Sequence, residues 1–232
     1  MRVLALPAEA RALILDFDGT LYSNPGYAAF QEEVLVGRLA RELGEEAAAT
    51  RARLARMRAE REAAGLGKTS LGRLFAELGV SIQTSALWRE QLIEPGRWLG
   101  PDGRLDEALA RLEARYALAL VTNNPRSVGA KGLEALGVAR RFRALVGLDD
   151  TMESKPAPEP FLLAARLLGV PAISCVSVGD RLEVDLAPAL GLGMGAILVE
   201  GVEDLYGLPG FLEAGPAPSS PREARRGGGM RP

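Results

Sequence analysis

The sequence contains no histidine among its 232 residues. This absence excludes the Ser-His-Asp and Cys-His nucleophile systems, zinc sites with histidine ligands, and acid–base catalysis by imidazole. Any proton transfer near neutral pH then depends on another titratable group. We expect carboxylates to carry such chemistry, because aspartate and glutamate also serve as acid–base groups in enzymes.

Cysteine is almost as scarce. Cys175 is the only one, so no disulfide can form within the chain. It lies in the apolar run 173–178, which predicts a buried strand residue. A lone thiol without a histidine is a poor candidate for a nucleophile.

Long apolar runs and an excess of positive charge are also missing. No stretch approaches the ~18 apolar residues of a membrane span. Pro7, Glu9 and Arg11 interrupt the apolar start too early for a signal peptide. The formal net charge of −2 provides no basic field to attract nucleic acid or an anionic membrane. We therefore expect a cytoplasmic protein that binds neither nucleic acid nor membranes.

Hydrophobic residues make up 47% of the chain, enough for a sizeable core. Short apolar runs alternate with segments whose apolar residues recur at three- and four-residue steps. The runs are 12–17, 117–121, 144–147, 173–178 and 196–199, and the helical patterns include 106–115, 127–136 and 160–168. Strands that alternate with helices indicate βαβ units. We therefore predict an α/β fold with a mainly parallel sheet covered on both faces.

One long segment interrupts this alternation. Residues 22–98 contain no convincing strand but four helical stretches, at 26–43, 45–63, 69–78 and 81–93. The sequence therefore predicts an all-helical domain over 22–98, inserted into an α/β core that comprises 1–21 and 99–213. Residues 214–232 are rich in glycine and proline, which predicts a flexible tail.

Polar side chains gather where the first apolar run ends. Asp16 and Asp18 are two residues apart, so they project to the same side at the carboxyl end of the strand. Ligands bind at that end of a parallel sheet. Two close carboxylates repel unless a cation neutralises them or one is protonated. Gly19 permits a tight turn, and Thr20 offers a hydroxyl and a backbone N–H to a phosphoryl group.

The later strands end in groups that complement this pair. Thr122 and Asn123 follow the second strand, Lys155 follows the third, and Asp180 and Asp185 follow the fourth. Because the carboxyl ends of parallel strands share one edge, we expect these side chains to converge on one crevice. Carboxylates supply hard oxygen ligands for Mg²⁺, while a lysine and a hydroxyl can hold a phosphoryl group.

Four ordered motifs carry a family resemblance. They are Asp16-Phe17-Asp18-Gly19-Thr20-Leu21, Thr122-Asn123, Lys155-Pro156-x-Pro158-x-x-Phe161 and Gly179-Asp180-x-x-x-x-Asp185. With this set the chain resembles the haloacid dehalogenase-like (HAD) superfamily. The helical insertion is similar to the C1-type cap of the subfamily that contains phosphoglycolate phosphatases, pyrimidine nucleotidases and β-phosphoglucomutases. The resemblance implies a Rossmann-like sheet of strand order 5-4-1-2-3 and Mg²⁺-dependent phosphoryl transfer through an aspartyl-phosphate.

The resemblance also implies a role for each motif residue. Asp16 would be the nucleophile and a Mg²⁺ ligand. Asp18 would protonate the leaving group and then activate water, with its backbone carbonyl on the metal. The other residues would hold phosphate or metal: Thr122 and Asn123 the phosphoryl group, Lys155 its negative charge and that of Asp16, Asp180 the Mg²⁺ ion, and Asp185 the ligand Asp180.

These residues predict a Mg²⁺-dependent phosphatase that hydrolyses a small phosphorylated metabolite. Asp18 favours phosphate over halide, because haloacid dehalogenases do not need a second aspartate as an acid. Two alternatives remain open: a phosphomutase on the same fold, and a receiver-type signalling module that keeps its phosphoryl group. The insertion over 22–98 and an aspartate placed to activate water argue against the signalling module. No pattern in the insertion identifies the phosphate ester.

Overall fold

The computed structural model describes residues 1–65 and 69–214. Six strands form one sheet in the order β1-β6-β5-β2-β3-β4. They are β1 (Arg2–Ala5), β2 (Ala12–Leu15), β3 (Ala117–Val121), β4 (Ala144–Val146), β5 (Cys175–Gly179) and β6 (Gly195–Leu198). Strands β2 to β6 are parallel to one another, which confirms the strand order predicted for them. Apart from Ala214, the expected tail over 214–232 lies outside the described residues.

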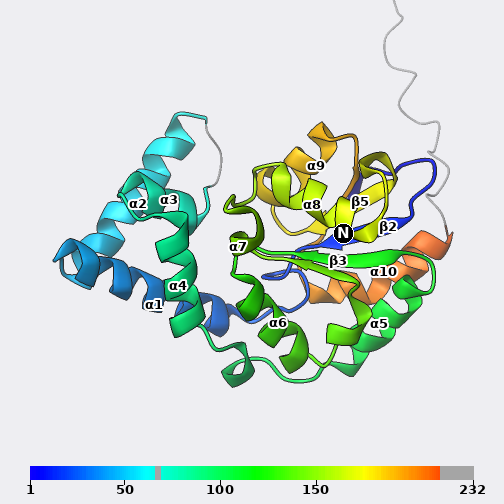
Figure 1. The fold of residues 1–232 in the computed structure, drawn as a ribbon, viewed down its shortest axis with the longest axis horizontal. Coiled ribbons are helices and arrows are strands. Elements are labelled where there is room, and N and C mark those ends of the chain that lie inside the picture. The colour runs from blue at the N-terminus through cyan, green and yellow to red at the C-terminus, as the bar shows by residue number, and fades with distance from the viewer. Residues whose placement is uncertain (66–68, 215–232) are drawn as a thin grey trace, which may run out of the picture.

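Alternation of side chains along the strands divides the core between the two faces of the sheet. Leu13 and Leu15 of β2 pack in one cluster with α5 (Gly103–Glu113), α6 (Arg126–Ala135) and α10 (Val202–Ala214). Ala12 and Ile14 pack in the other with α8 (Glu159–Leu168) and α9 (Ala187–Gly191). Figure 1 shows α8 and α9 above the sheet and α5, α6 and α10 below it. Cys175 is fully buried on the α8 side, which confirms its interpretation as a core residue.

Short helical turns complete the connections between these elements. They are α7 (Leu148–Thr151), the 3₁₀ turns η1 (Pro95–Arg97), η2 (Ala139–Arg141) and η3 (Ala172–Ser174), and the π-helical turn η4 (Leu182–Leu186). Over the described ranges, no helix is both long and apolar enough to cross a membrane.

Strand β1 was not expected from the sequence. It pairs antiparallel with β6 and matches Arg2 with Leu198. The pairing shifts register between Val3 and Ala5. The strand has only four residues, too few to show an alternating pattern.

Four α-helices occupy the part of the insertion that the structure describes, as predicted. They are α1 (Pro25–Leu43), α2 (Ala47–Ala63), α3 (Leu71–Glu77) and α4 (Ile82–Leu92). Local signals define their ends: the Asn24 side chain accepts the backbone N–H of Tyr27 at 2.9 Å, and α1 stops at Gly44 with a left-handed φ of 67°. Ser70 and Ser81 cap α3 and α4 in the same way. In Figure 1 these helices stand beside the sheet, on the left.

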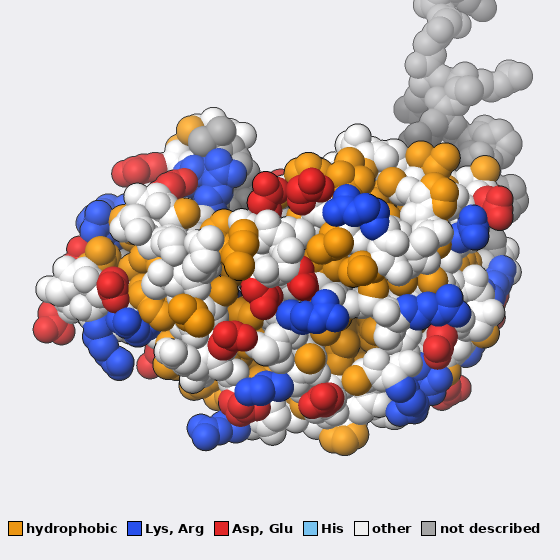
Figure 2. Space-filling model, viewed as in Figure 1, with side chains coloured by type: hydrophobic (Ala, Val, Ile, Leu, Met, Phe, Trp, Pro, Cys, Tyr) orange, Lys and Arg blue, Asp and Glu red, His pale blue; other side chains and the backbone are white. Residues whose placement is uncertain are grey.

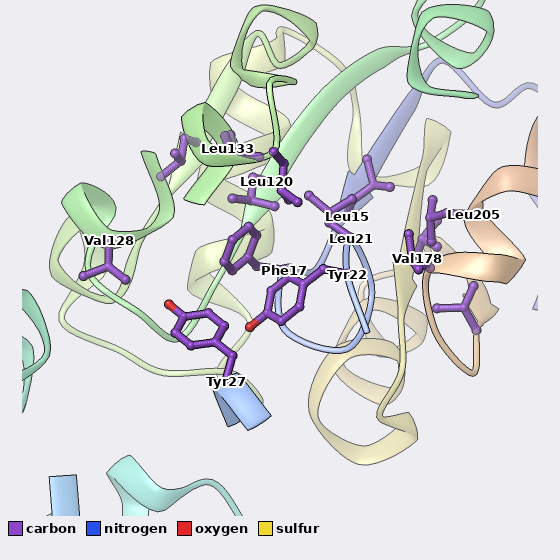
Figure 3. Packing of buried hydrophobic residues seen from close by; sticks show 14 of the residues in the cluster. Leu15, Phe17, Leu21, Tyr22, Tyr27, Leu120, Val128, Leu133, Val178 and Leu205 are labelled. Carbon is purple, nitrogen blue, oxygen red and sulfur yellow. The ribbon is translucent and has the colours of Figure 1, made fainter. Parts of the chain in front are cut away.

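Aromatic side chains join the insertion to the sheet. Phe17 lies 5.1 Å from Tyr22 between ring centroids, and Tyr22 lies 5.5 Å from Tyr27. Figure 3 shows these three rings gathered below Leu120. A Cβ on Gly132 of α6 would lie 2.1 Å from the Phe17 ring, so this close packing requires glycine there. The contacts fix the segment that carries Asp16 and Asp18.

Candidate active site

The strand register brings the predicted residues to one edge of the sheet. Leu15, the last residue of β2, pairs with Val178 of β5, and β3 runs beside β2 in the same direction. Asp16, Thr122 and Asp180 each follow directly after one of these three strands. The edge is the carboxyl end of the parallel sheet, where ligands bind in folds of this kind.

Asp16 lies at the centre of this edge. Its backbone N–H donates to the Val178 carbonyl at 2.9 Å, so the chain is still tied to β5 at this point. Lys155 Nζ lies 2.5 Å from Asp16 Oδ1 and 2.7 Å from Asp185 Oδ1. All three side chains are almost fully buried. One ammonium group therefore bridges two carboxylates out of contact with water.

Burial and neighbouring charges together set the pKa values of these groups. Burial and the Asp185 carboxylate raise the pKa of Asp16 to about 7, although Lys155 and Arg181 act to lower it. Burial opposes the charged form of Lys155, but the carboxylates of Asp16 and Asp185 outweigh it and raise the pKa of this lysine. Lys155 is therefore positively charged at neutral pH and can stabilise a neighbouring anion.

The acidic side chains at this edge fit a divalent cation. Asp16, Asp180 and Asp185 each place a carboxylate oxygen within 4.8 Å of the others. Asp180 Oδ1 is buried with no hydrogen-bond partner among the described residues, and burial raises the pKa of Asp180. A Cβ on Gly19 would lie 2.7 Å from Asp180 Oδ2, so only glycine leaves room for that oxygen in its observed position. Hard oxygen ligands in this number suit an ion such as Mg²⁺, which would offset the crowded negative charge.

The carboxylate of Asp18 belongs to a different network. Its Oδ1 accepts hydrogen bonds from the Tyr22 hydroxyl and from Gln31 Nε2, the latter at 2.9 Å. Its Oδ2 accepts from Asn124 Nδ2 at 2.9 Å. Burial and the Asp18 charge raise the pKa of Tyr22, so its hydroxyl stays protonated and donates. The Asp18 carboxylate is thus held in place both by Asn124 of the core and by Gln31 of α1.

Asn124 connects Asp18 to a buried arginine of the insertion. Arg89 of α4 donates from Nη1 to Asn124 Oδ1 at 3.0 Å, while the Nδ2 of the same amide donates to Asp18. Burial lowers the pKa of Arg89 to about 10, with Asp18 acting in the opposite sense. The guanidinium therefore remains charged at neutral pH although it is shielded from water.

The predicted phosphate-binding residues lie at the same edge with different partners. Thr20 Oγ1 lies 3.5 Å from Asp16 Oδ2. Thr122 Oγ1 accepts the backbone N–H of Asn124 at 3.1 Å. Asn123 accepts the Lys155 N–H at 2.8 Å and donates to the Lys155 carbonyl at 3.2 Å. The Asn123 side chain therefore fixes the backbone that carries Lys155.

Sequence reasoning missed Tyr22, Gln31, Arg89 and Arg181 as site residues. Arg181 Nε lies 3.6 Å from a carboxylate oxygen of Asp180 and the same distance from one of Asp185, and its place inside the fourth motif could have revealed it. Gln31 lies on the buried face of α1, where a polar residue among apolar ones was the available signal. Nothing in the sequence marks Arg89 apart from its neighbours.

Two cavities open beside Asp18. One of about 430 Å³ is bounded by Gly19, Tyr22 and Asp180, among others. The other, of about 270 Å³, reaches along α1 past Gln31. Figure 2 shows that the surface is hollowed between the helical insertion and the body of the sheet. A small molecule could therefore contact core and insertion at once.

Comparison with known proteins agrees with this geometry. The haloacid dehalogenase-like hydrolase family matches residues 10–193. A phosphoglycolate phosphatase of Shigella boydii serotype 4 (strain Sb227) is 34% identical over 204 residues, which cover 79% of each chain. The solved HAD phosphatase from Thermococcus onnurineus has a TM-score of 0.54 and 23% identity, over 82% of this chain and 86% of its own. A 2-haloacid dehalogenase from Pseudomonas syringae pv. Tomato DC3000 has a TM-score of 0.51 and 21% identity, over 92% and 91%. Both solved structures share the fold.

Proposed function

Because this chain belongs to the haloacid dehalogenase-like hydrolases, we propose that it hydrolyses the phosphate monoester of a small molecule, with Asp16 as the nucleophile. One observation carries this proposal: Asp16 and Asp18 are two residues apart but lie in separate surroundings. Asp16 contacts Lys155 beside other carboxylates, whereas three neutral side chains hold Asp18 next to the cavities. Two carboxylates in different surroundings suit a nucleophile and an acid–base group.

In the first step, a carboxylate oxygen of Asp16 bonds to phosphorus and the bond from phosphorus to the leaving oxygen breaks. Asp18 gives that oxygen a proton, so the leaving group departs as an alcohol. Lys155 stays protonated and offsets the negative charge. Thr20 and Thr122 supply hydroxyls for the phosphoryl oxygens. Asp16 then carries the phosphoryl group as an aspartyl-phosphate.

In the second step, water attacks the aspartyl-phosphate. Asp18 is now ionised and takes a proton from the water molecule as the water oxygen bonds to phosphorus. The bond between phosphorus and Asp16 breaks, phosphate leaves, and both aspartates return to their starting states. Hydrogen bonds from Tyr22, Gln31 and Asn124 stabilise the ionised form of Asp18 between the two steps.

The carboxylates of Asp16 and Asp180 and the backbone carbonyl of Asp18 would hold a Mg²⁺ ion, supported by Asp185. When bound, the ion supplies positive charge that stabilises the transferring phosphoryl group. The three neighbouring carboxylates and the Asp180 oxygen that has no hydrogen-bond partner among the described residues support this assignment. We expect removal of divalent metal to abolish turnover.

The helical segment 22–98 would act as a cap over the core formed by 1–21 and 99–213. Gln31 and Arg89 support this role, because both extend from the insertion into the network around Asp18. In this arrangement the core performs phosphoryl transfer, and the cap contacts the leaving group.

Turnover of p-nitrophenyl phosphate with Mg²⁺ tests the proposal. The wild-type protein should release many nitrophenol molecules per chain, and both excess EDTA and Asp16→Asn should stop the reaction. Glu134→Gln, on the exposed face of α6, is a matched control that should behave as wild type. If Asp16→Asn kept more than about a tenth of wild-type kcat, roughly 1.4 kcal/mol of barrier, another residue would be the nucleophile.

A substrate panel follows from the comparisons. Phosphoglycolate, the substrate named for the Shigella relative, is the first ester to test, beside sugar phosphates and nucleoside monophosphates. Chloride release from 2-chloropropionate tests the activity named for the Pseudomonas structure. We expect phosphate release and no chloride release, because Asp18 is held as an acid–base group.

A further inference from the structure

Arg89 carries a buried charge that the proposed reaction does not use. Its side chain is 8% exposed, and across residues 1–65 and 69–214 no carboxylate oxygen lies within 4.0 Å of its nitrogens. Only Nη1 hydrogen-bonds to a described residue, Asn124, and Nε is buried without a partner. A buried cation without a counter-ion is unfavourable. An anion supplied by a ligand would satisfy it.

A cavity of about 240 Å³ adjoins Arg89 between the insertion and the core. Its polar lining includes Arg73 and Ser85 from the insertion and Ser154 from the core, and none of its lining residues is acidic. Ser85 Oγ is buried with no hydrogen-bond partner in the described chain. The cavity thus combines two arginines and an unused hydroxyl, the chemistry of an anion site.

This cavity adjoins the reaction site, and the two share walls. Ser70, Arg89 and Asn123 line both this cavity and the one of about 270 Å³ that opens beside Asp18. A leaving group that receives its proton from Asp18 would therefore extend toward Arg89. A single amide, that of Asn124, separates the two side chains.

We propose that the cavity defined by Arg73, Ser85 and Arg89 binds a carboxylate on the leaving group of the substrate. The inference rests on the proposed function, because a leaving group exists only if the chain cleaves an ester. Since Nη1 of Arg89 is occupied by Asn124, the edge formed by Nε and Nη2 is left for the ligand. That edge presents two parallel N–H groups, which match the two oxygens of a carboxylate.

The hydrogen bond to Asn124 does not by itself explain why an arginine is buried at position 89. A neutral donor would satisfy the Asn124 oxygen without placing a charge in a buried position. Asp18 already accepts hydrogen bonds from Tyr22, Gln31 and Asn124, so it has no need of the guanidinium. The charge itself remains to be explained, and an anionic ligand explains it.

Two esters of equal length test this assignment: 2-phosphoglycolate and 2-hydroxyethyl phosphate, which differ in the carboxylate. The measured quantity is the ratio of kcat/KM for the two esters. We expect the wild-type protein to favour phosphoglycolate and Arg89→Met to lower the ratio by about 10- to 100-fold, the range of charge-assisted hydrogen bonds. Loss of support for Asn124 would slow both esters alike, so the ratio cancels that effect.

Further variants sharpen the comparison. Arg89→Lys keeps the charge without the two-nitrogen edge and should give an intermediate ratio. Arg53→Met is the matched control, because Arg53 of α2 lines neither of the two cavities that Arg89 lines and pairs with Glu45 at 2.8 Å, and it should keep the ratio. Ser85→Ala should lower the ratio about three- to tenfold, as expected for one hydrogen bond.

The outcomes separate this inference from the proposed function. Equal kcat/KM for the two esters in the wild-type protein would overturn the carboxylate site and leave the phosphatase intact, and this result needs no variant. An unchanged ratio in Arg89→Met would do the same. Failure of the wild-type protein to cleave any phosphate ester would overturn both.

Discussion

Replacing Asp18 with asparagine should create a conflict that the surrounding side chains cannot resolve. All three contacts to the Asp18 carboxylate are donors: Tyr22 and Gln31 to Oδ1, and Asn124 to Oδ2. An asparagine that keeps its oxygen toward Tyr22 and Gln31 directs its NH₂ group at Asn124 Nδ2. Rotation of the Asn124 amide would only turn that NH₂ group toward Nη1 of Arg89, another donor. In the opposite orientation the NH₂ group of the asparagine can donate to the Tyr22 hydroxyl, but it then faces the NH₂ group of Gln31. Rotating the Gln31 amide would only turn that NH₂ group toward Asn124 Nδ2.

One buried donor therefore stays unpaired in Asp18→Asn. Such a group costs about 1–3 kcal/mol, which is the expected loss in the free energy of unfolding. For a chain of this size, each kcal/mol lowers Tm by about 2–4 °C. Urea unfolding and thermal melts measure both quantities. Adding Arg89→Met to Asp18→Asn frees the Asn124 amide to rotate. The double variant should therefore lose less unfolding stability than the two single variants lose in sum. Additive losses, or no loss in Asp18→Asn, would refute the reasoning.

The same substitution should separate the two chemical steps. Alkyl phosphates need a protonated leaving group, so their turnover should fall about 10²- to 10⁴-fold, the usual range for acid–base assistance. p-Nitrophenyl phosphate needs little protonation, so the variant should form the aspartyl-phosphate and then stall for lack of a base. Rapid-quench kinetics should show a burst near one nitrophenol per chain. Wild-type turnover of alkyl phosphates would show that Asp18 is not the acid–base group.

Three other variants and reagents test separate features of the site and core. Lys155→Met removes the cation that bridges two buried carboxylates and should lower unfolding stability in urea by about 3–5 kcal/mol. Lys131→Met, at an exposed pair, should change it by less than about 1 kcal/mol, and equal effects would contradict the buried pairing. Gly19→Ala places a Cβ against Asp180 and should weaken Mg²⁺ binding, measured by calorimetry, about tenfold or more, as changes beside metal ligands usually do. Unchanged affinity would exclude Asp180 as a ligand. Burial raises the pKa of Cys175 to about 11, so its thiol is neutral at pH 8 and a disulfide reagent should label it quickly only in urea; fast labelling of the folded chain would contradict its burial.

The α/β core could be predicted because its strands are covered on both faces. Such strands consist of consecutive apolar residues, as in 12–15 of β2 and 117–121 of β3, and each is followed at once by polar residues. Asp16 and Asp180 could be assigned to one edge for the same reason, since parallel strands end together. β1 escaped prediction because its existence depends on pairing with β6, a contact between opposite ends of the described chain.

The network around Asp18 could not be predicted in the same way. Gln31 contacts Asp18, and Arg89 contacts Asn124, only because the insertion packs against the core in one orientation. Helical periodicity indicates which face of α1 or α4 is buried, but not which partner that face meets. Polar residues on a buried face, such as Gln31, are therefore the positions that call for a tertiary explanation.

The two outer strands of the sheet have consequences for how the chain behaves at high concentration. β1 has four residues, begins with Arg2 and shifts register before Ala5, and β4 has three residues directly after Arg143. An outer strand offers unpaired backbone groups to strands of other molecules, and short length, charge and bulges all oppose such pairing. Neither border of the sheet thus gives a second molecule a long, flat template. Self-association through added strands should be slow even in concentrated solution.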